Sequence, residues 1–123
     1  MGSVRVLVVD EDRDVVDLAQ SFLEREEPTL EVETATSASA ALDRVERSSV
    51  DVVVSDFQMP EMDGLELADA VHERAPDLPY VLYTARHRSS LEDAVGDRVA
   101  GYVQKGTGRE QYAELASLID EVT

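Results

Sequence analysis

The 123-residue sequence contains no cysteine, and Lys105 is its only lysine. The absence of cysteine excludes a disulfide framework, a thiolate zinc site, an iron–sulfur cluster and a cysteine nucleophile. No run of residues approaches the roughly 20 apolar positions that a membrane-spanning helix needs. The N-terminus also lacks the basic stretch and cleavage region of a secretory signal peptide. We therefore predict a cytoplasmic protein that does not insert into a membrane.

Acidic residues greatly outnumber basic ones. The sequence has 27 Asp and Glu against 11 Lys and Arg, which gives a formal net charge of −16 at pH 7. A field of this sign repels the phosphate backbone of a nucleic acid, so no direct nucleic-acid partner is expected. The acidic residues are spread along the chain, as in proteins of salt-loving microbes, where high ionic strength screens the self-repulsion. Hydrophobic residues make up 43% of the sequence, enough for the core of one domain over residues 1–123.

Five short apolar runs rich in β-branched residues recur along the chain, and helix-length segments separate them. They are Val4 to Val9, Leu30 to Ala35, Val50 to Ser55, Pro79 to Thr84 and Ala100 to Gln104. The first and third are almost continuously apolar, which is typical of strands covered on both faces, whereas the second alternates with charged residues like an edge strand. This pattern predicts an α/β fold, a five-stranded parallel sheet flanked by helices on both faces. Right-handed crossovers leave few topologies, and the flavodoxin-like order 2-1-3-4-5 is the natural one for five strands.

Apolar residues at helical spacing mark the segments between the strands. The predicted helices contain residues 15–23, 41–45, 65–71 and 112–122, with a weaker candidate at Leu91 to Val95. Ser37 or Ser39 is expected to cap the second helix. Pro28 and Pro76 lie where the first and third helices have ended.

Polar side chains follow four of the predicted strands at the point where each strand ends. Asp10 and Glu11 follow the first strand, Asp56 the third, Thr84 ends the fourth, and Lys105 follows the fifth. In an open parallel sheet, functional groups collect just beyond the carboxyl ends of the strands. Three carboxylates gathered there repel one another and favour a divalent cation, and all-oxygen ligands favour Mg²⁺ or its mimic Mn²⁺. A lysine and a hydroxyl beside that ion suit an additional anion, for which a phosphoryl group is the natural candidate.

Each of these residues is weak evidence when taken alone. Acidic residues are so frequent in this chain that one Asp after a strand could simply cap the next segment. The lone lysine is more informative, although a solvated lysine at a strand end is also ordinary. His72 and His87 are expected at the surface rather than as ligands, with His87 near the same edge of the sheet. The prediction of a site therefore rests on the whole group of residues.

The motifs that carry this group resemble the receiver domain of two-component response regulators. They are Asp10-Glu11 after Val-Leu-Val-Val, the segment Asp56-Phe57-Gln58-Met59-Pro60-Glu61-Met62-Asp63-Gly64, then Thr84-Ala85, and Gly101-Tyr102-Val103-Gln104-Lys105. The Asp-x-x-Met-Pro-x-Met-Asp-Gly segment is highly specific, and the others occur in the right order. The resemblance spans essentially the whole chain, which could be a stand-alone receiver or part of a longer protein.

The resemblance implies a phosphorylation site. In that family, the aspartate in the position of Asp56 attacks the phosphorus of a phosphohistidine on a partner sensor histidine kinase. The residues in the positions of Asp10 and Glu11, with Asp56 and the backbone carbonyl of Gln58, hold Mg²⁺. Lys105 would pair with the phosphoryl oxygens. Such a domain is not an enzyme in the ordinary sense, because it catalyses only its own phosphorylation and dephosphorylation.

The resemblance also implies a conformational switch. The Thr84 hydroxyl would move to bond the phosphoryl group, and this movement would leave room for Tyr102 to turn inward. The surface formed by the fourth helix, fifth strand and fifth helix would then repack and contact an output partner protein, which the sequence does not identify. Such a switch is a local charge event that biases an element with two arrangements.

Several positions depart from the family pattern. Gly106 stands where the family usually has a proline with a cis peptide, so another source of rigidity is needed for this loop. Glu11 replaces the commoner aspartate and has a longer reach. Gln58 and Arg86 occupy positions where the family tunes the lifetime of the phosphoryl group, so we expect these side chains to set it here.

Two other functions remain as alternatives. Asp10-Glu11-Asp12 directly after the first strand resembles the start of haloacid dehalogenase-type phosphatases, in which the first Asp is the nucleophile and the second a general acid. Asp14 departs from that motif, which wants Thr or Val at this position. The second alternative is a degenerate receiver that binds partners without phosphorylation, which would apply if the missing proline has disabled the loop around Gly106.

Overall fold

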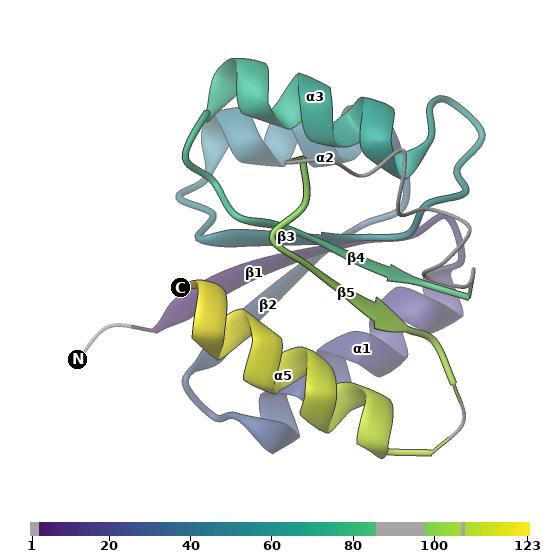
Figure 1. The fold of residues 1–123 in the computed structure, drawn as a ribbon, viewed down its shortest axis with the longest axis vertical. Coiled ribbons are helices and arrows are strands. Elements are labelled where there is room, and N and C mark those ends of the chain that lie inside the picture. Colours follow the sequence, from purple (N-terminus) through teal and green to yellow (C-terminus); the bar gives the residue numbers. More distant parts are fainter. Residues whose placement is uncertain (1–2, 86–97, 107) are drawn as a thin grey trace.

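The computed structural model describes residues 3–85, 98–106 and 108–123 as one parallel sheet with helices on both faces (Figure 1). The strands are β1 Val4–Val9, β2 Leu30–Ala35, β3 Val52–Ser55, β4 Tyr80–Thr84 and β5 Gly101–Gln104. They lie in the order β2-β1-β3-β4-β5, and every neighbouring pair is parallel. The predicted fold class and strand order are therefore confirmed. Strands β3, β4 and β5 begin one or two residues later than the apolar runs suggested.

Four helices cover the sheet in the described part of the chain. They are α1 Arg13–Glu26, α2 Ala38–Arg47, α3 Gly64–Arg74 and α5 Glu110–Val122. Helices α2 and α3 lie over one face of the sheet, and α1 and α5 lie over the other (Figure 1). The weaker helix predicted at Leu91 to Val95 lies outside the described residues. Within the described ranges, no helix has the length and apolar character to cross a membrane.

Alternating strand residues contribute their side chains to two hydrophobic cores, one on each face of the sheet. Val6 and Val8 of β1 pack with α1 and α5, while Leu7 and Val9 pack with α2 and α3. Strands β1 and β3 are buried on both faces, which explains their continuous apolar sequences. Strand β2 pairs only with β1, and its Glu31 is exposed, so its predicted position at the edge is confirmed.

Side-chain caps start three of the helices close to the carboxyl ends of the strands. The Asp12 carboxylate accepts a hydrogen bond from the Asp14 backbone N–H at the start of α1. Ser37, one of the two predicted caps, accepts from the Ala40 N–H at the start of α2. Asp63 begins α3 with a capping box in which its side chain and that of Glu66 bond each other's backbone. These caps fix the short segments that leave the same edge of the sheet.

Candidate functional site

Asp10 directly follows β1 in a position that is almost closed to solvent. Its residue surface is 3% exposed. Its backbone N–H donates to the Ala35 carbonyl (3.1 Å), which continues the ladder with β2. One carboxylate oxygen, Oδ1, accepts the Asp12 N–H (2.9 Å), and the other, Oδ2, lies 2.5 Å from Lys105 Nζ. Strand pairing and two donors thus fix the position of this buried charge.

Asp56 follows β3 and is held mainly by backbone groups. Its N–H donates to the Val9 carbonyl (3.0 Å), and its Oδ1 accepts the Phe57 N–H (2.8 Å). Its Oδ2 lies 3.4 Å from Lys105 Nζ. One oxygen is therefore used to orient the side chain, and the other faces the lysine.

Gly64 closes the segment behind Asp56 against the start of α3. Its N–H donates to the Phe57 carbonyl (2.7 Å), and a Cβ at this position would lie 2.5 Å from the Asp56 carbonyl oxygen. Only glycine allows this close approach. From β4, the buried Tyr80 hydroxyl donates to the Gly64 carbonyl (2.7 Å). Burial raises the pKa of Tyr80 above its ordinary value of 10.0, so the hydroxyl stays neutral and keeps donating.

Lys105 directly follows β5, and its side chain reaches the carboxylates of Asp10 and Asp56. Its backbone N–H donates to the Thr84 carbonyl (2.8 Å), and its Nζ reaches both Asp10 and Asp56. The same Nζ lies 5.6 Å from the centre of the Tyr83 ring, within the range of a cation–π contact. The structure therefore brings Asp10, Asp56 and Lys105 together, as the strand ends predicted. Thr84 lies in the same region, buried at the end of β4.

Burial governs the ionisation of the Asp10 carboxyl group. Burial is the largest influence and raises the pKa of Asp10 above its ordinary value of 3.8. The hydrogen bonds from Lys105 and Asp12 and the positive charge of Lys105 act in the opposite direction, while the negative charge of Asp56 raises the pKa further. The net pKa of Asp10 remains raised, so the single lysine does not fully offset the cost of burying this carboxylate.

The acidic residues do not form a complete metal cage in the described residues. Glu11 and Gln58 are exposed, and no three His, Cys, Asp or Glu side chains of the described ranges are grouped so as to hold an ion. Lys105 occupies the space between Asp10 and Asp56 instead. The donor chemistry fits Mg²⁺ nevertheless, because the neighbouring carboxylates of Asp10 and Asp56 supply the oxygen ligands that a hard divalent cation prefers.

The structure describes two of the four remaining residues that the sequence singled out. Tyr102 is half-buried against the core beneath α2 and α3, and its hydroxyl oxygen is shielded from solvent. His72 was expected at the surface but is half-buried, and its Nε2 lies 3.0 Å from the Leu78 carbonyl, so it serves the packing of α3. Arg86 and His87 lie outside the described residues.

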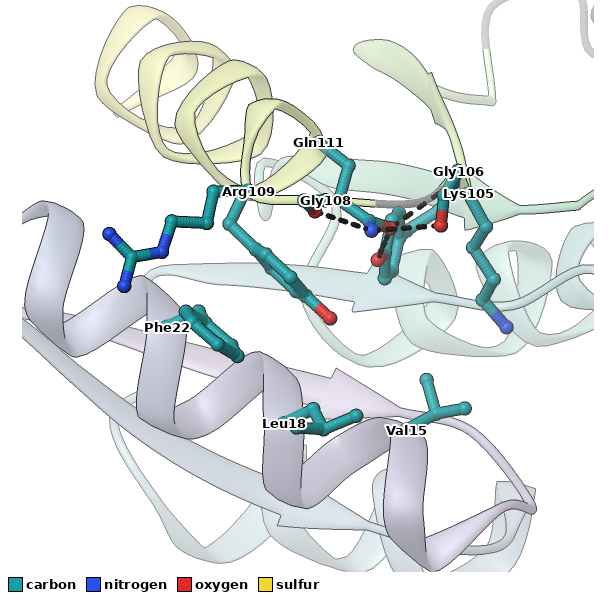
Figure 2. Close-up of a pocket in the computed structure, with 10 residues that line it drawn as sticks. Val15, Leu18, Phe22, Lys105, Gly106, Gly108, Arg109 and Gln111 are labelled. Carbon is teal, nitrogen blue, oxygen red and sulfur yellow. Dashed lines mark hydrogen bonds between the residues drawn. The ribbon is translucent and has the colours of Figure 1, made fainter.

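The sequence analysis missed a cluster of side chains on the other side of Lys105. Figure 2 shows the Gln111 side chain reaching back from the first turn of α5 to the backbone that follows Lys105. A cavity of about 490 Å³ lies beside it, between α1 and α5, and includes Phe22 and Tyr112, whose rings stack with centroids 4.9 Å apart. The pair of glycines, Gly106 and Gly108, just before a helix was the available signal, because glycine-rich segments need anchoring.

Comparisons with known proteins give the family. A model of the response regulator receiver domain matches residues 6–117. The response regulator MprA of a Mycobacterium species is 39% identical over 119 residues, which are 97% of this chain and 47% of that protein. A protein-glutamate methylesterase/protein-glutamine glutaminase of a Nocardioides species is 33% identical over 108 residues, 85% of this chain and 30% of that protein. The chain thus spans less than half the length of these curated relatives.

Solved structures show the same fold over nearly the whole chain. The response regulator TrrA of Thermotoga maritima, in complex with Mg²⁺ and BeF, has a TM-score of 0.85 and 27% identity, covering 98% of this chain and 99% of that one. A chemotaxis protein of Vibrio cholerae has a TM-score of 0.82 and 26% identity, covering 99% and 100%. Neither the phosphatase nor the binding-only alternative is favoured by these similarities. The chain belongs to the receiver domain family of response regulators, the class that acts in phosphorelay signal transduction.

Proposed function

We propose that Asp56 accepts a phosphoryl group from the phosphohistidine of a sensor histidine kinase, with Mg²⁺ and Lys105 offsetting the charge. The observation that carries this proposal is the single ammonium group of Lys105 placed against both Asp10 and Asp56. A lysine held between two carboxylates at the carboxyl edge of a parallel sheet is suited to bind an incoming anion there.

The two oxygens of Asp56 have different roles in this reaction. Oδ1 accepts the Phe57 N–H, which holds the carboxylate in one orientation. Oδ2 therefore attacks phosphorus, and an O–P bond forms as the P–N bond of the phosphohistidine breaks. The electron pair of the broken bond goes to the imidazole nitrogen of the kinase. Lys105 pairs with the phosphoryl oxygens, so that little of the developing charge is left uncompensated.

The metal would be held by Asp10, Glu11, Asp56 and the backbone carbonyl of Gln58. When bound, Mg²⁺ or Mn²⁺ would neutralise charge on the carboxylates and on the transferred group. The raised pKa of Asp10 supports this assignment, since a nearby cation would relieve the cost of burying that carboxylate.

Phosphorylation would be transmitted to a neighbouring surface through Thr84 and Tyr102. Thr84 is buried at the end of β4, and its carbonyl accepts the Lys105 N–H, so the residue whose hydroxyl would contact the phosphoryl group is bonded directly to the chain that follows β5. Tyr102 lies on the adjacent β5, in register with Leu82. The face built on β5 and α5 would then contact an output partner, which we expect to be a protein.

A phosphorylation assay tests this function directly. The wild-type protein, Asp56→Asn and a matched control, Asp120→Asn, which changes an exposed aspartate of α5, are incubated with acetyl phosphate and Mg²⁺. We expect wild type and the control to gain one phosphoryl group that is stable in acid and labile in base, and Asp56→Asn to gain none. An adduct on Asp10 would indicate the phosphatase instead. A folded wild-type protein without any adduct would indicate a receiver that only binds partners.

A further inference from the structure

The Gln111 side chain makes four hydrogen bonds with groups around Lys105. Its Oε1 accepts from the Tyr83 hydroxyl and from the Gly106 N–H (3.2 Å). Its Nε2 donates to the carbonyls of Gly106 (2.9 Å) and Gly108 (3.0 Å). The dashed lines in Figure 2 follow these bonds from α5 to the segment after Lys105. Both backbone polar groups of Gly106 are thus bound by one side chain.

Only an amide can make this set of bonds. Two donors, a hydroxyl and an N–H, converge on one end of the side chain, and two carbonyl acceptors converge on the other. A carboxylate at position 111 would place an oxygen against the carbonyls of Gly106 and Gly108, and an apolar side chain would leave all four groups without this partner. The arrangement is therefore specific to glutamine at this position.

The segment that Gln111 binds needs an external anchor. Gly106 has no heavy atom within 4 Å of the place where a Cβ would lie, and Gly108 adopts a left-handed backbone conformation with φ of 88°. Glycines lose more conformational freedom on ordering than any other residue. Arg109 makes no side-chain cap hydrogen bond at the start of α5, and the Gln111 amide bonds the backbone of Gly106 and Gly108 just before this helix.

Two sets of contacts link Gln111 to the Lys105 ammonium group, one through the Gly106 backbone and one through the Tyr83 side chain. The backbone of Lys105 is held on one side by the Thr84 carbonyl and on the other by Gly106, which Gln111 binds. Tyr83 donates its hydroxyl to Gln111 and presents its ring 5.6 Å from Lys105 Nζ. Burial raises the pKa of Tyr83 above its ordinary value of 10.0, so the hydroxyl remains a donor at neutral pH.

We propose that Gln111 is a positioning residue for phosphoryl transfer, whose amide ties the Gly106 and Gly108 backbone and Tyr83 together and so holds Lys105 Nζ at Asp10 and Asp56. This inference rests on the proposed function, since it assigns Gln111 a part in that same reaction. It explains how the lysine is held when a flexible glycine follows it in the chain. The Gln111 amide bonds Tyr83 and the backbone of Gly106 and Gly108, whereas the contacts with Asp10 and Asp56 are made by Lys105, so Gln111 acts through Lys105.

The first test compares three variants in the acetyl phosphate reaction with saturating Mg²⁺. Gln111→Met keeps the length of the side chain and removes its hydrogen bonds, and Gln111→Glu keeps an acceptor but loses the amide donor. Gln20→Met is the matched control, because Gln20 Nε2 also donates from a helix to a backbone carbonyl, that of Val32 in β2, and β2 is at the opposite edge of the sheet from β5. We expect both Gln111 variants to lower the rate constant about tenfold or more, as for a displaced reacting group, with the control within about twofold of wild type.

A second test shows whether the effect passes through Lys105. The Gln111→Met change is made in wild type and in Lys105→Met, and the four proteins form a double-mutant cycle. We expect Gln111→Met to add no further loss once Lys105 is absent. Full additivity of the two losses would overturn the proposal, because a general weakening of the fold would act in both backgrounds. Amide hydrogen exchange of Gly106 reports the anchor without any reaction, and we expect its protection to fall in Gln111→Met but not in Gln20→Met.

The outcomes separate this inference from the proposed function. If wild type gains no phosphoryl group on Asp56, the proposed function fails and the role of Gln111 fails with it. If wild type is phosphorylated and Gln111→Met reacts as fast as Gln20→Met, only the role of Gln111 is overturned. Unchanged Gly106 protection in Gln111→Met would also contradict the anchor.

Discussion

Two tyrosines of β4, three residues apart, support the two halves of the site from opposite faces of the sheet. Tyr80 packs with the core beneath α2 and α3 and donates to Gly64, behind the acidic half formed by Asp10 and Asp56. Tyr83 packs with the core beneath α1 and α5 and donates to Gln111, behind the cationic half formed by Lys105.

The two halves are held by different kinds of contact. The acidic half depends on strand ladders and backbone N–H groups, and its carboxylates sit on buried strand ends. The cationic half depends on one helix side chain that binds a glycine-containing segment. Damage to the backbone packing that supports the acidic half, leaving its two carboxylates in place, should therefore appear mainly as lost stability. Damage to the cationic half should appear mainly as a slower reaction in a protein that remains folded.

The largest expected effect on stability comes from adding one methyl group to the acidic half. In Gly64→Ala, the new Cβ would lie 2.5 Å from the Asp56 carbonyl oxygen, so the backbone must shift. We expect the free energy of unfolding to fall by about 2–3 kcal/mol. Gly106→Ala is the matched control in the cationic half, because nothing lies within 4 Å of its Cβ. Urea denaturation should show a change within about 0.5 kcal/mol for that variant. Equal losses in both would refute the difference between the halves.

Alkaline pH should weaken both halves through the buried tyrosines. Burial raises the pKa of Tyr80 and of Tyr83 above 10.0. Above pH 10 the unfolded chain therefore releases these protons while the folded protein keeps them, so the stabilisation present below pH 10 is lost as pH rises. Each tyrosine should lower the unfolding free energy by about 1.4 kcal/mol per pH unit in this range. In denaturation series from pH 8 to pH 11, Tyr80→Phe and Tyr83→Phe should each show a shallower decline than wild type; an unchanged slope would contradict this assignment.

The smallest expected changes come from removing one hydroxyl at a time at neutral pH. Tyr80→Phe loses a fully buried hydrogen bond to Gly64 and should lower the unfolding free energy by about 1 kcal/mol, with little change in phosphorylation rate. Tyr83→Phe loses one of the four bonds to Gln111 and should slow phosphorylation more than Tyr80→Phe does, with a smaller loss of stability. Urea denaturation measures the loss of stability in Tyr80→Phe and Tyr83→Phe, and acetyl phosphate kinetics measure the loss of phosphorylation rate in the same two proteins. The reverse order would show that the two tyrosines do not divide the site in this way.

The parts of the molecule fixed by strand periodicity could be predicted from the sequence. Continuous apolar runs identified β1 and β3 as central strands, and the residues after the strands identified Asp10, Asp56 and Lys105 as neighbours. Parallel strands deliver their carboxyl ends to one edge, so this placement needs no knowledge of side-chain packing.

The parts fixed by side-chain packing could not be predicted in the same way. The role of Gln111 depends on how α5 docks and on the path of the chain after Lys105, neither of which has a periodic signature. The contact of His72 with the Leu78 carbonyl depends on a turn that α3 packs against. The position of the Glu11 side chain depends on the groups around it rather than on the strand that precedes it, and here it remains exposed.

Direct identification of the phosphorylated residue tests the central claim most sharply. The protein is treated with acetyl phosphate and Mg²⁺, the acyl phosphate is reduced with borohydride, and the modified residue is located by peptide mass spectrometry. Conversion of Asp56 alone to homoserine is the result expected if Asp56 is the acceptor beside Lys105. Conversion of Asp10, or of no residue in a folded and Mg²⁺-treated sample, would contradict the site proposed for this chain.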